Sequence, residues 1–208
     1  MGMTETEMIG VIVLACLVTA VIVRLLVGFA QRETDLRDCG DSGLYLDTGI
    51  AQTMGNKEIQ SDRVRAERTQ AGALAVIADG IGKRNIGEVC AQIAMDTILD
   101  RYEPYTFLSE PDHFFRMSFY EANRRVQMTL ERSKGGTSLG AVFVNGTKLY
   151  YALAGNIRIA LFRGGEIIPL SKGHTLDVLA EEAWKDGKIS RQEAVWSMEE
   201  KRMWNYVG

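Results

Sequence analysis

Residues 72–88, which read GALAVIADGIGKRNIGE, decide the fold of this chain. They open with a continuous apolar run that ends at Asp79, and such a run is typical of a strand buried on both faces. Gly80 and Gly82 indicate a tight turn. From Ile86 the apolar spacing becomes that of an amphipathic helix. The stretch therefore predicts a strand, a turn and a helix, with a carboxylate at the end of the strand.

The rest of the chain alternates between helical and strand patterns in blocks. A second helix is predicted over 111–133, opened by Pro111. The following segment, 137–171, consists of short strands with turns at NGT (145–147) and RGGE (163–166). Two short helices come after it, and Ser190 is the expected N-cap of the second. Blocks of strands and helices predict an α+β fold with antiparallel sheets.

Residues 8–30 form an almost unbroken apolar segment whose one charge is Arg24. At 1.5 Å per residue the segment is long enough to span a hydrocarbon core of about 30 Å. The alternatives are a signal peptide, which usually has a basic start whereas this chain begins MGMTETE, and a fully buried helix. We expect a transmembrane anchor.

Flanking charges set the expected orientation. Arg24, Arg32 and Arg37 lie at the C-terminal end of the span, and only Glu5 and Glu7 lie before it. The positive-inside rule then places the C-terminal part in the cytoplasm of a single-pass protein of the cell membrane. The expected organisation is a tail (1–7), a transmembrane helix (8–30), a juxtamembrane linker (31–43) and one domain (44–208).

Composition excludes some functions. The chain has 24 Lys and Arg against 27 Asp and Glu, a net charge of −3, and no basic stripe, so nucleic-acid binding is not expected. Its three cysteines, Cys16, Cys39 and Cys90, lie far apart. Their spacing suggests neither a disulfide framework nor a structural zinc site.

Asp79 and Asp62 are the candidate metal ligands. Asp62 lies in GNKEIQSDRV, a segment expected to pair beside the Asp79 strand. Two neighbouring carboxylates require a cation between them, because like charges at close range are costly. Mg²⁺ and Mn²⁺ favour carboxylate, backbone carbonyl and water ligands. Alone, Asp79 is more typical of a turn or helix cap than of a metal ligand, and Asp62 could be a surface acid.

Four stretches in order resemble the metal-dependent Ser/Thr protein phosphatases of the PP2C (PPM) type, in their bacterial form. They are GNKEIQSDRV, AVIADGIGKRNIGEVCAQIA, GGTSLGAVFVNGTKLYYALAGNIRIALFRGGEIIPLSKGHT and DGKISRQEAV. The resemblance implies a β-sandwich of two antiparallel sheets flanked by helices. It also implies two Mg²⁺ or Mn²⁺ ions, whose bound water attacks phosphoserine or phosphothreonine.

By position, the resemblance makes Asp62 and Asp79 metal ligands and the catalytic residues of the centre. Gly80 corresponds to the residue that gives its backbone carbonyl to the metal. Lys57 falls where the family usually has a phosphate-binding arginine, and lysine lacks the bidentate fork. The alternative for Lys57 is a solvated surface lysine.

Several positions depart from the family pattern. Ser61 replaces an acid or amide, and Lys83 stands in place of a glycine beside the site. Asn156 replaces an aspartate associated with a third metal, which makes that third site doubtful. Gly173 replaces a frequent aspartate, and His174 is expected to be structural.

The chain stops before the family's two further metal-binding aspartates, so the domain is expected to be C-terminally incomplete: a fragment or a degenerate relative. The predicted function is a membrane-anchored Ser/Thr phosphatase acting on phosphoproteins of a cytosolic kinase. The alternatives are an inactive pseudophosphatase that serves as a binding module, and a purely structural domain.

Overall fold

The computed structural model describes residues 46–55, 58–131, 133–198 and 202–208, which all belong to one compact unit, Tyr45–Gly208. The predicted tail, membrane segment and linker (1–43) lie outside the described residues, so their structure stays a prediction. Among the residues that are described, no helix combines the length and apolar character needed to cross a membrane.

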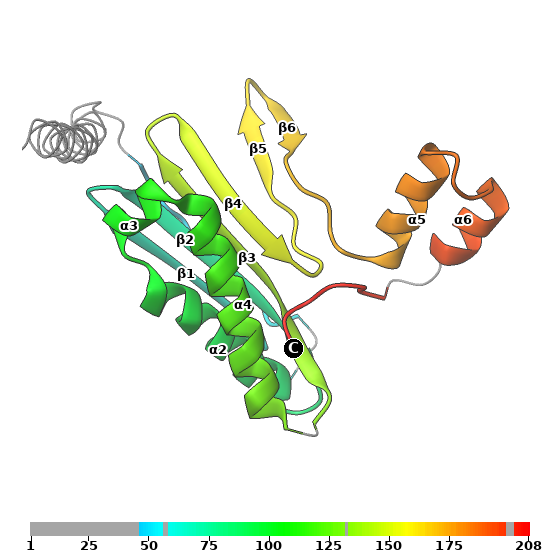
Figure 1. The fold of residues 1–208 in the computed structure, drawn as a ribbon, viewed down its shortest axis with the longest axis horizontal. Helices are drawn as coiled ribbons and strands as arrows, with labels where there is room; N and C mark the ends of the chain where they lie inside the picture. The colour runs from blue at the N-terminus through cyan, green and yellow to red at the C-terminus, as the bar shows by residue number, and fades with distance from the viewer. Residues whose placement is uncertain (1–45, 56–57, 132, 199–201) are drawn as a thin grey trace, which may run out of the picture. The chain divides into compact units, whose positions relative to one another are not determined.

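Two antiparallel sheets organise the chain, as predicted (Figure 1). The larger sheet has four strands in the order β1-β2-β3-β4, and the smaller one pairs β5 with β6. The strands are β1 (Asp62–Thr69), β2 (Gly72–Gly82), β3 (Gly135–Asn145), β4 (Lys148–Ala154), β5 (Ala160–Arg163) and β6 (Glu166–Pro169). The helices are α2 (Ile86–Arg101), α3 (Pro104–Ser109), α4 (Pro111–Leu130), α5 (Leu176–Lys185) and α6 (Arg191–Met198). The predicted α+β class is confirmed.

Local sequence accounts for most of these boundaries. Glycines hold the left-handed conformation in both predicted hairpin turns: Gly146 has φ 53°, and Gly164 and Gly165 have φ 62° and 86°. The predicted cap of α6 is confirmed by a reciprocal pair of hydrogen bonds. The amide of Glu193 donates to Ser190 Oγ at 3.3 Å, and the amide of Ser190 donates to a Glu193 carboxylate oxygen at 2.8 Å.

Alternating side chains of the larger sheet build the core. Leu74, Val76 and Ala78 of β2 are essentially inaccessible to solvent. They share one face with the inaccessible Leu139 and Phe143 of β3. Helices α2 and α4 cover this face, and their buried side chains join the same apolar cluster (Figure 1). The helices therefore pack on one side of the sheet.

The opposite face of β2 corrects the prediction of a strand buried on both faces. Ile77 is 44% exposed and Ala75 is also exposed. Cross-strand neighbours on this face are apolar as well: Val64 pairs with Ile77, and Tyr151 is 40% exposed. A continuous apolar run indicates two apolar faces, but it does not show that both are covered.

The predicted sandwich of two sheets is present only in part. Strand β6 is exposed at all four residues, and Ile167 is 74% and Phe162 70% exposed. One link to the larger sheet is the hydroxyl of Tyr151, which donates to the carbonyl of Leu170 at 2.7 Å. In the described part of the chain, both sheets thus carry apolar surface that faces solvent.

The aromatic centre of the core lies in a helix that the sequence pattern did not reveal. Phe107 of α3 is fully buried, and its ring centroid lies 4.4 Å from that of Phe143. Phe114, Phe115 and Tyr102 contact the Phe107 ring at 5.1–6.0 Å, edge to face. Such contacts add to the free energy of apolar burial.

The C-terminal segment 202–208 extends the sheet beyond the end of β4. Val207 exchanges two backbone hydrogen bonds with Thr137 of β3, at 2.8 and 3.0 Å. Earlier in the segment, Met203 forms an isolated bridge with Thr175, the residue just before α5. The segment therefore links the start of β3 to the start of α5.

Candidate functional site

The two predicted metal ligands lie directly opposite each other. Asp62 begins β1, Asp79 lies near the end of β2, and the antiparallel register pairs them. Residues directly opposite in such a pair have Cβ atoms about 4.5–5.5 Å apart on the same face of the sheet. Both side chains are partly buried. The expected juxtaposition is thus confirmed, whereas the role of the two carboxylates as ligands stays a prediction.

Gly80 lies where β2 meets the first turn of α2. Its amide donates to the carbonyl of Ser61 at 3.3 Å, so the pairing with β1 continues past Asp79. A Cβ at Gly80 would lie 2.1 Å from the carbonyl oxygen of Gly87, which is closer than any side chain tolerates. Glycine is therefore required here for close packing, as well as for the turn that the sequence suggested.

Two hydroxyl residues of β3 complete the other side of β2. Thr137 and Ser138 are fully buried, and Ser138 is the cross-strand partner of Asp79. Thr137 Oγ1 donates to the Asp79 carbonyl at 2.9 Å and so holds the backbone of this candidate ligand. These residues lie in the GGTS stretch, and the sequence alone indicated no role for them. The sequence feature that could have identified them is the presence of small polar residues in an otherwise apolar strand.

Arg63 ties the start of β1 to α2. Its guanidinium donates to the carbonyls of Gln60 and Asp62, at 3.0 and 2.8 Å. It also donates to Gln92 Oε1 at 2.9 Å and pairs with the carboxylate of Glu88. Sequence reasoning missed this residue, because its partners on α2 lie 25 and 29 positions away. Arg63 fixes the backbone that carries Asp62.

Asn156 lies at the same end of the sheet as the two acids. The backbone amide of Asn156 donates to Ser138 Oγ at 3.1 Å, and Ser138 is the cross-strand neighbour of Asp79. The residue is exposed, and its Oδ1 occupies the space that a Cβ on Gly173 would need, 2.4 Å away. The two departures from the family pattern are therefore in contact. The third-metal role of Asn156 stays untested.

The structure bears on the role predicted for His174, but not on the role predicted for Lys57. The His174 ring packs at a tilt against Trp204 with centroids 4.9 Å apart, and its Nδ1 lies 3.0 Å from Asn205 Nδ2. These contacts agree with the structural role expected of it. Lys57, the expected phosphate contact, lies outside the described residues.

The donor set suits a hard divalent cation, but it is small. Asp62 and Asp79 supply carboxylate oxygens on one face, and Gly80 follows directly with a backbone carbonyl. Oxygen donors of this kind are those that Mg²⁺ and Mn²⁺ prefer. In the described ranges, no group of three or more His, Cys, Asp or Glu side chains is placed to hold an ion. Among the described residues, Asp62 and Asp79 are thus two candidate side-chain ligands for such a centre.

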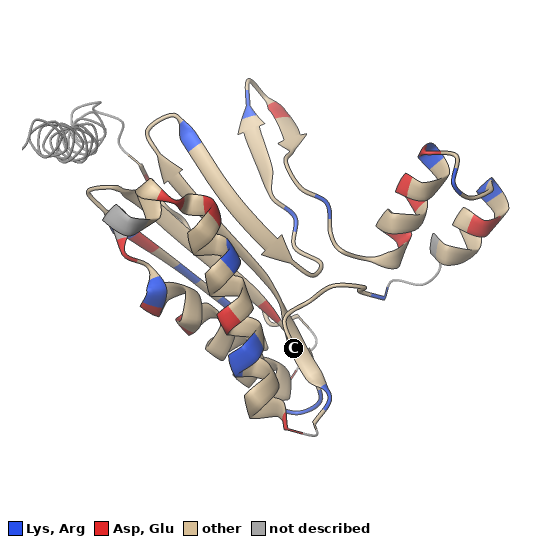
Figure 2. Cartoon of the chain, viewed as in Figure 1, with Lys and Arg blue, Asp and Glu red and all other residues tan. Residues whose placement is uncertain are grey.

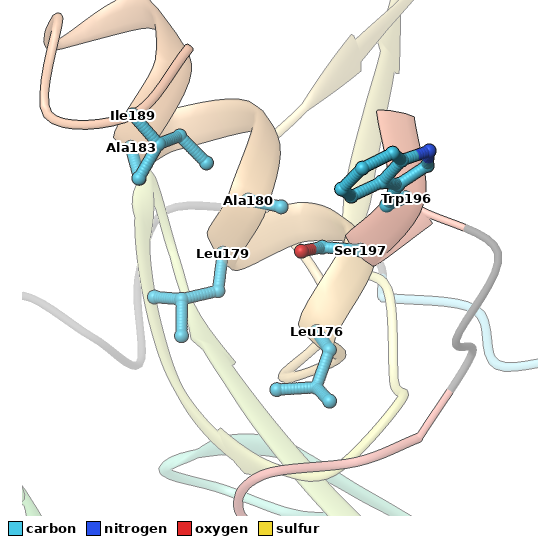
Figure 3. Close-up of a pocket in the computed structure, with 7 residues that line it drawn as sticks. All are labelled: Leu176, Leu179, Ala180, Ala183, Ile189, Trp196 and Ser197. Carbon is cyan, nitrogen blue, oxygen red and sulfur yellow. The ribbon is translucent and has the colours of Figure 1, made fainter. Parts of the chain in front are cut away.

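An apolar groove that neither acid lines lies between α5 and α6. Figure 3 shows Trp196 of α6 and Leu179 of α5 at this groove, whose volume is about 480 Å³. Its remaining lining residues are Leu176, Ala180, Ala183, Ile189 and Ser197. No ionisable side chain lines it, so it offers no acid, base or metal ligand for catalysis.

Comparison with known proteins identifies the family of this chain. The family model described as protein phosphatase 2C matches residues 47–183. A serine/threonine phosphatase, stp, of Listeria welshimeri is 24% identical over 129 residues, which are 59% of this chain and 50% of the relative. The serine/threonine protein phosphatase PstP of Mycobacterium tuberculosis is 31% identical over 144 residues, 65% of this chain and 27% of the relative.

A solved structure shares the fold. The PPM Ser-Thr phosphatase MsPP of Mycobacterium smegmatis, in complex with cacodylate, superposes with a TM-score of 0.54 at 25% identity. The match covers 73% of this chain and 62% of MsPP. The chain thus spans about half of the Listeria relative and about a quarter of the mycobacterial one. Because the family model covers well over half of its 208 residues, this chain belongs to the protein phosphatase 2C family.

Proposed function

We propose that this chain belongs to a metal-dependent serine/threonine protein phosphatase. The observation that carries the proposal is the direct pairing of Asp62 with Asp79 at one end of the sheet, within the matched region. The named activity of the relatives supports the same reaction class, the hydrolysis of phosphoserine and phosphothreonine.

In the proposed centre Asp62, Asp79 and the carbonyl of Gly80 would hold Mg²⁺ or Mn²⁺. When bound, such ions would lower the pKa of a bound water and neutralise charge on the phosphoryl oxygens. The protein would contribute positioning, because Thr137 and Arg63 hold the backbone on either side of the two acids. Lys57 is proposed to contact the phosphate.

A membrane location is part of the same proposal. The apolar segment 8–30, followed by Arg32 and Arg37, supports a single-pass anchor with the phosphatase domain in the cytoplasm. Substrates would then be phosphoproteins made by a cytosolic Ser/Thr kinase. Protease digestion of sealed inverted vesicles tests this orientation, because the domain should be cleaved only when the cytoplasmic face is outside.

Phosphate release by the full-length protein tests the activity. We expect release from a phosphothreonine peptide that depends on Mn²⁺, and we expect Asp79→Asn to abolish it together with Mn²⁺ binding measured by calorimetry. Asp100→Asn is the matched control, because Asp100 is an exposed acid at the far end of α2. Turnover that is unchanged in Asp79→Asn contradicts the proposal.

A second candidate function is a pseudophosphatase, a binding module that uses the same fold. The small donor set among the described residues and the Asn156–Gly173 contact favour it. A full-length protein that binds a phosphopeptide without metal-dependent turnover would establish this alternative.

A further inference from the structure

Three cations meet at the loop end of β2 and β3. Gly82, the last residue of β2, pairs with Gly135, the first residue of β3. Lys83 and Arg84 follow Gly82 directly, and Lys134 directly precedes Gly135. The paired glycines therefore bring two loops together, and all three side chains are exposed. Figure 2 shows Lys and Arg colouring on both loops, at the lower end of the sheet.

These cations are not neutralised by the acids around them. Over the described ranges, none of the ion pairs involves Lys83, Arg84 or Lys134. The acid in the first turn of α2, Glu88, is engaged by Arg63. Glu131 lies near Lys134 in sequence and is the one remaining acid in these loops. The rim formed by Lys83, Arg84 and Lys134, called the cationic rim below, thus has excess positive charge.

The start of α2 adds to this positive potential. The helix follows Arg84 and Asn85, and the N-cap Asn85 gives no side-chain hydrogen bond to it. The N-terminus of a helix carries partial positive charge from its free amides. Arg84 is held at φ 56°, a conformation uncommon for a residue with a side chain. The loop therefore presents its cations in a defined geometry rather than in an extended chain.

The cationic rim lies a short distance beyond the proposed metal ligands. Lys83 follows Asp79 by four residues along β2 and the turn, which corresponds to roughly 13 Å at about 3.3 Å per strand residue. An extended peptide covers roughly 3.3–3.6 Å per residue. The Lys83 side chain and an acidic side chain of the peptide can extend toward each other across this distance. An acidic residue about two to four positions from the phosphoresidue would therefore contact the rim.

We propose that the cationic rim binds acidic side chains of the phosphopeptide and gives the site a preference for phosphoserine or phosphothreonine in acidic sequences. This inference rests on the proposed function, since it uses that site as the place where the phosphoresidue binds. It also gives Lys83, which replaces a glycine of the family pattern, a specific role. Exposed ion pairs are individually weak, so the preference arises from the three cations together.

Binding and turnover of two phosphothreonine peptides test the inference. One peptide carries Glu at the positions two to four residues on either side of the phosphothreonine, and the other carries Gln there. Fluorescence anisotropy with the full-length protein and Mn²⁺ should show about tenfold tighter binding of the Glu peptide, because each exposed pair contributes about two- to fivefold. The preference should fall steeply between 50 mM and 500 mM salt.

The variant Lys83→Gln/Arg84→Asn/Lys134→Gln should reduce the preference to below twofold. Asparagine is chosen at position 84 because it tolerates the left-handed conformation. The matched control is Lys148→Gln/Arg163→Gln, which removes exposed cations from the start of β4 and the end of β5, and it should keep the full preference. Thermal melts by circular dichroism verify that both variants fold.

The possible failures are distinguishable. A triple variant that keeps the tenfold preference overturns the inference. Equal binding of the two peptides by the wild-type protein also overturns it, although phosphate release would leave the proposed function intact. The triple variant could lose binding to vesicles with 30% phosphatidylserine and keep the peptide preference of the wild-type protein. That result would assign the rim to lipid binding and overturn the inference. Preferential binding of the Glu peptide without phosphate release supports the inference and contradicts the proposed function.

Discussion

Gly80 and Gly87 bring the end of β2 and the first turn of α2 into backbone contact. A Cβ on Gly80 would lie 2.1 Å from the Gly87 carbonyl oxygen, and a Cβ on Gly87 would lie 2.8 Å from the Gly80 carbonyl carbon. Neither position has space for a side chain. This contact sets the path of the backbone directly after Asp79, so the candidate site depends on packing as well as on its carboxylates.

The first prediction follows from this contact. Gly80→Ala should destabilise the fold by about 1–3 kcal/mol, because the methyl group forces the strand and the helix apart. It should also weaken Mn²⁺ binding, since the displaced backbone carries Asp79. Urea denaturation and calorimetry measure the two effects. Gly49→Ala, at a site with open space, is the control, and equal stability of the two variants would contradict the prediction.

How much of this site was predictable depends on the distance in sequence between interacting groups. The strand, turn and helix around Asp79 follow from local apolar spacing, and so do the glycine-containing hairpin turns. The pairing of Asp62 with Asp79 was also predictable, because the two strands are close in sequence and antiparallel neighbours usually pair. These elements rest on contacts within about 20 residues.

Contacts over longer distances were not predictable from a single sequence. Arg63 finds Gln92 across 29 positions, and Val207 pairs with Thr137 across 70. Neither contact leaves a periodic signal in the chain. The six-residue helix around Phe107 is too short to show a helical period. Whether the second apolar face of β2 is exposed depends on whether another element packs against it. The sequence of the strand contains no information about that.

A second prediction concerns Arg63. Arg63→Gln should lower Mn²⁺ affinity about tenfold, the lower end of the effect of residues that orient metal ligands. The reason is that the guanidinium holds the carbonyls of Gln60 and Asp62 beside the candidate ligand. Arg63→Lys should recover only part of the affinity, because lysine lacks the planar fork.

The control for Arg63 is Arg116→Gln, at an exposed arginine of α4. Calorimetry gives the Mn²⁺ affinity and melting gives the stability of each variant. A positioning role requires a loss of affinity larger than any loss of stability explains. Unchanged affinity in Arg63→Gln with a lowered melting temperature would show that Arg63 is only structural.

A third prediction concerns the aromatic centre of the core. Phe107→Ala should cost about 3–5 kcal/mol of the free energy of unfolding, because the side chain is fully buried and the cavity cannot close completely. Phe107→Leu should cost less, since it keeps much of the volume. Urea denaturation followed by circular dichroism measures both. A cost below 1 kcal/mol for Phe107→Ala would show that α3 does not complete the core.

The last prediction concerns pH and the surface of α4. Hydrogen bonds from Arg124, which has the larger effect, and from Arg125 lower the pKa of Glu121 from 4.5 to about 2. Because the pKa is depressed in the folded state, the carboxylate contributes its stability above pH 4.5 and loses it as the pH falls through about 2. The melting-temperature difference between wild type and Glu121→Gln should therefore be constant from pH 7 to pH 5 and shrink below pH 4.5. It should also shrink in 1 M salt, which screens exposed charges. A difference that grows on acidification would contradict this assignment of the ion pairs.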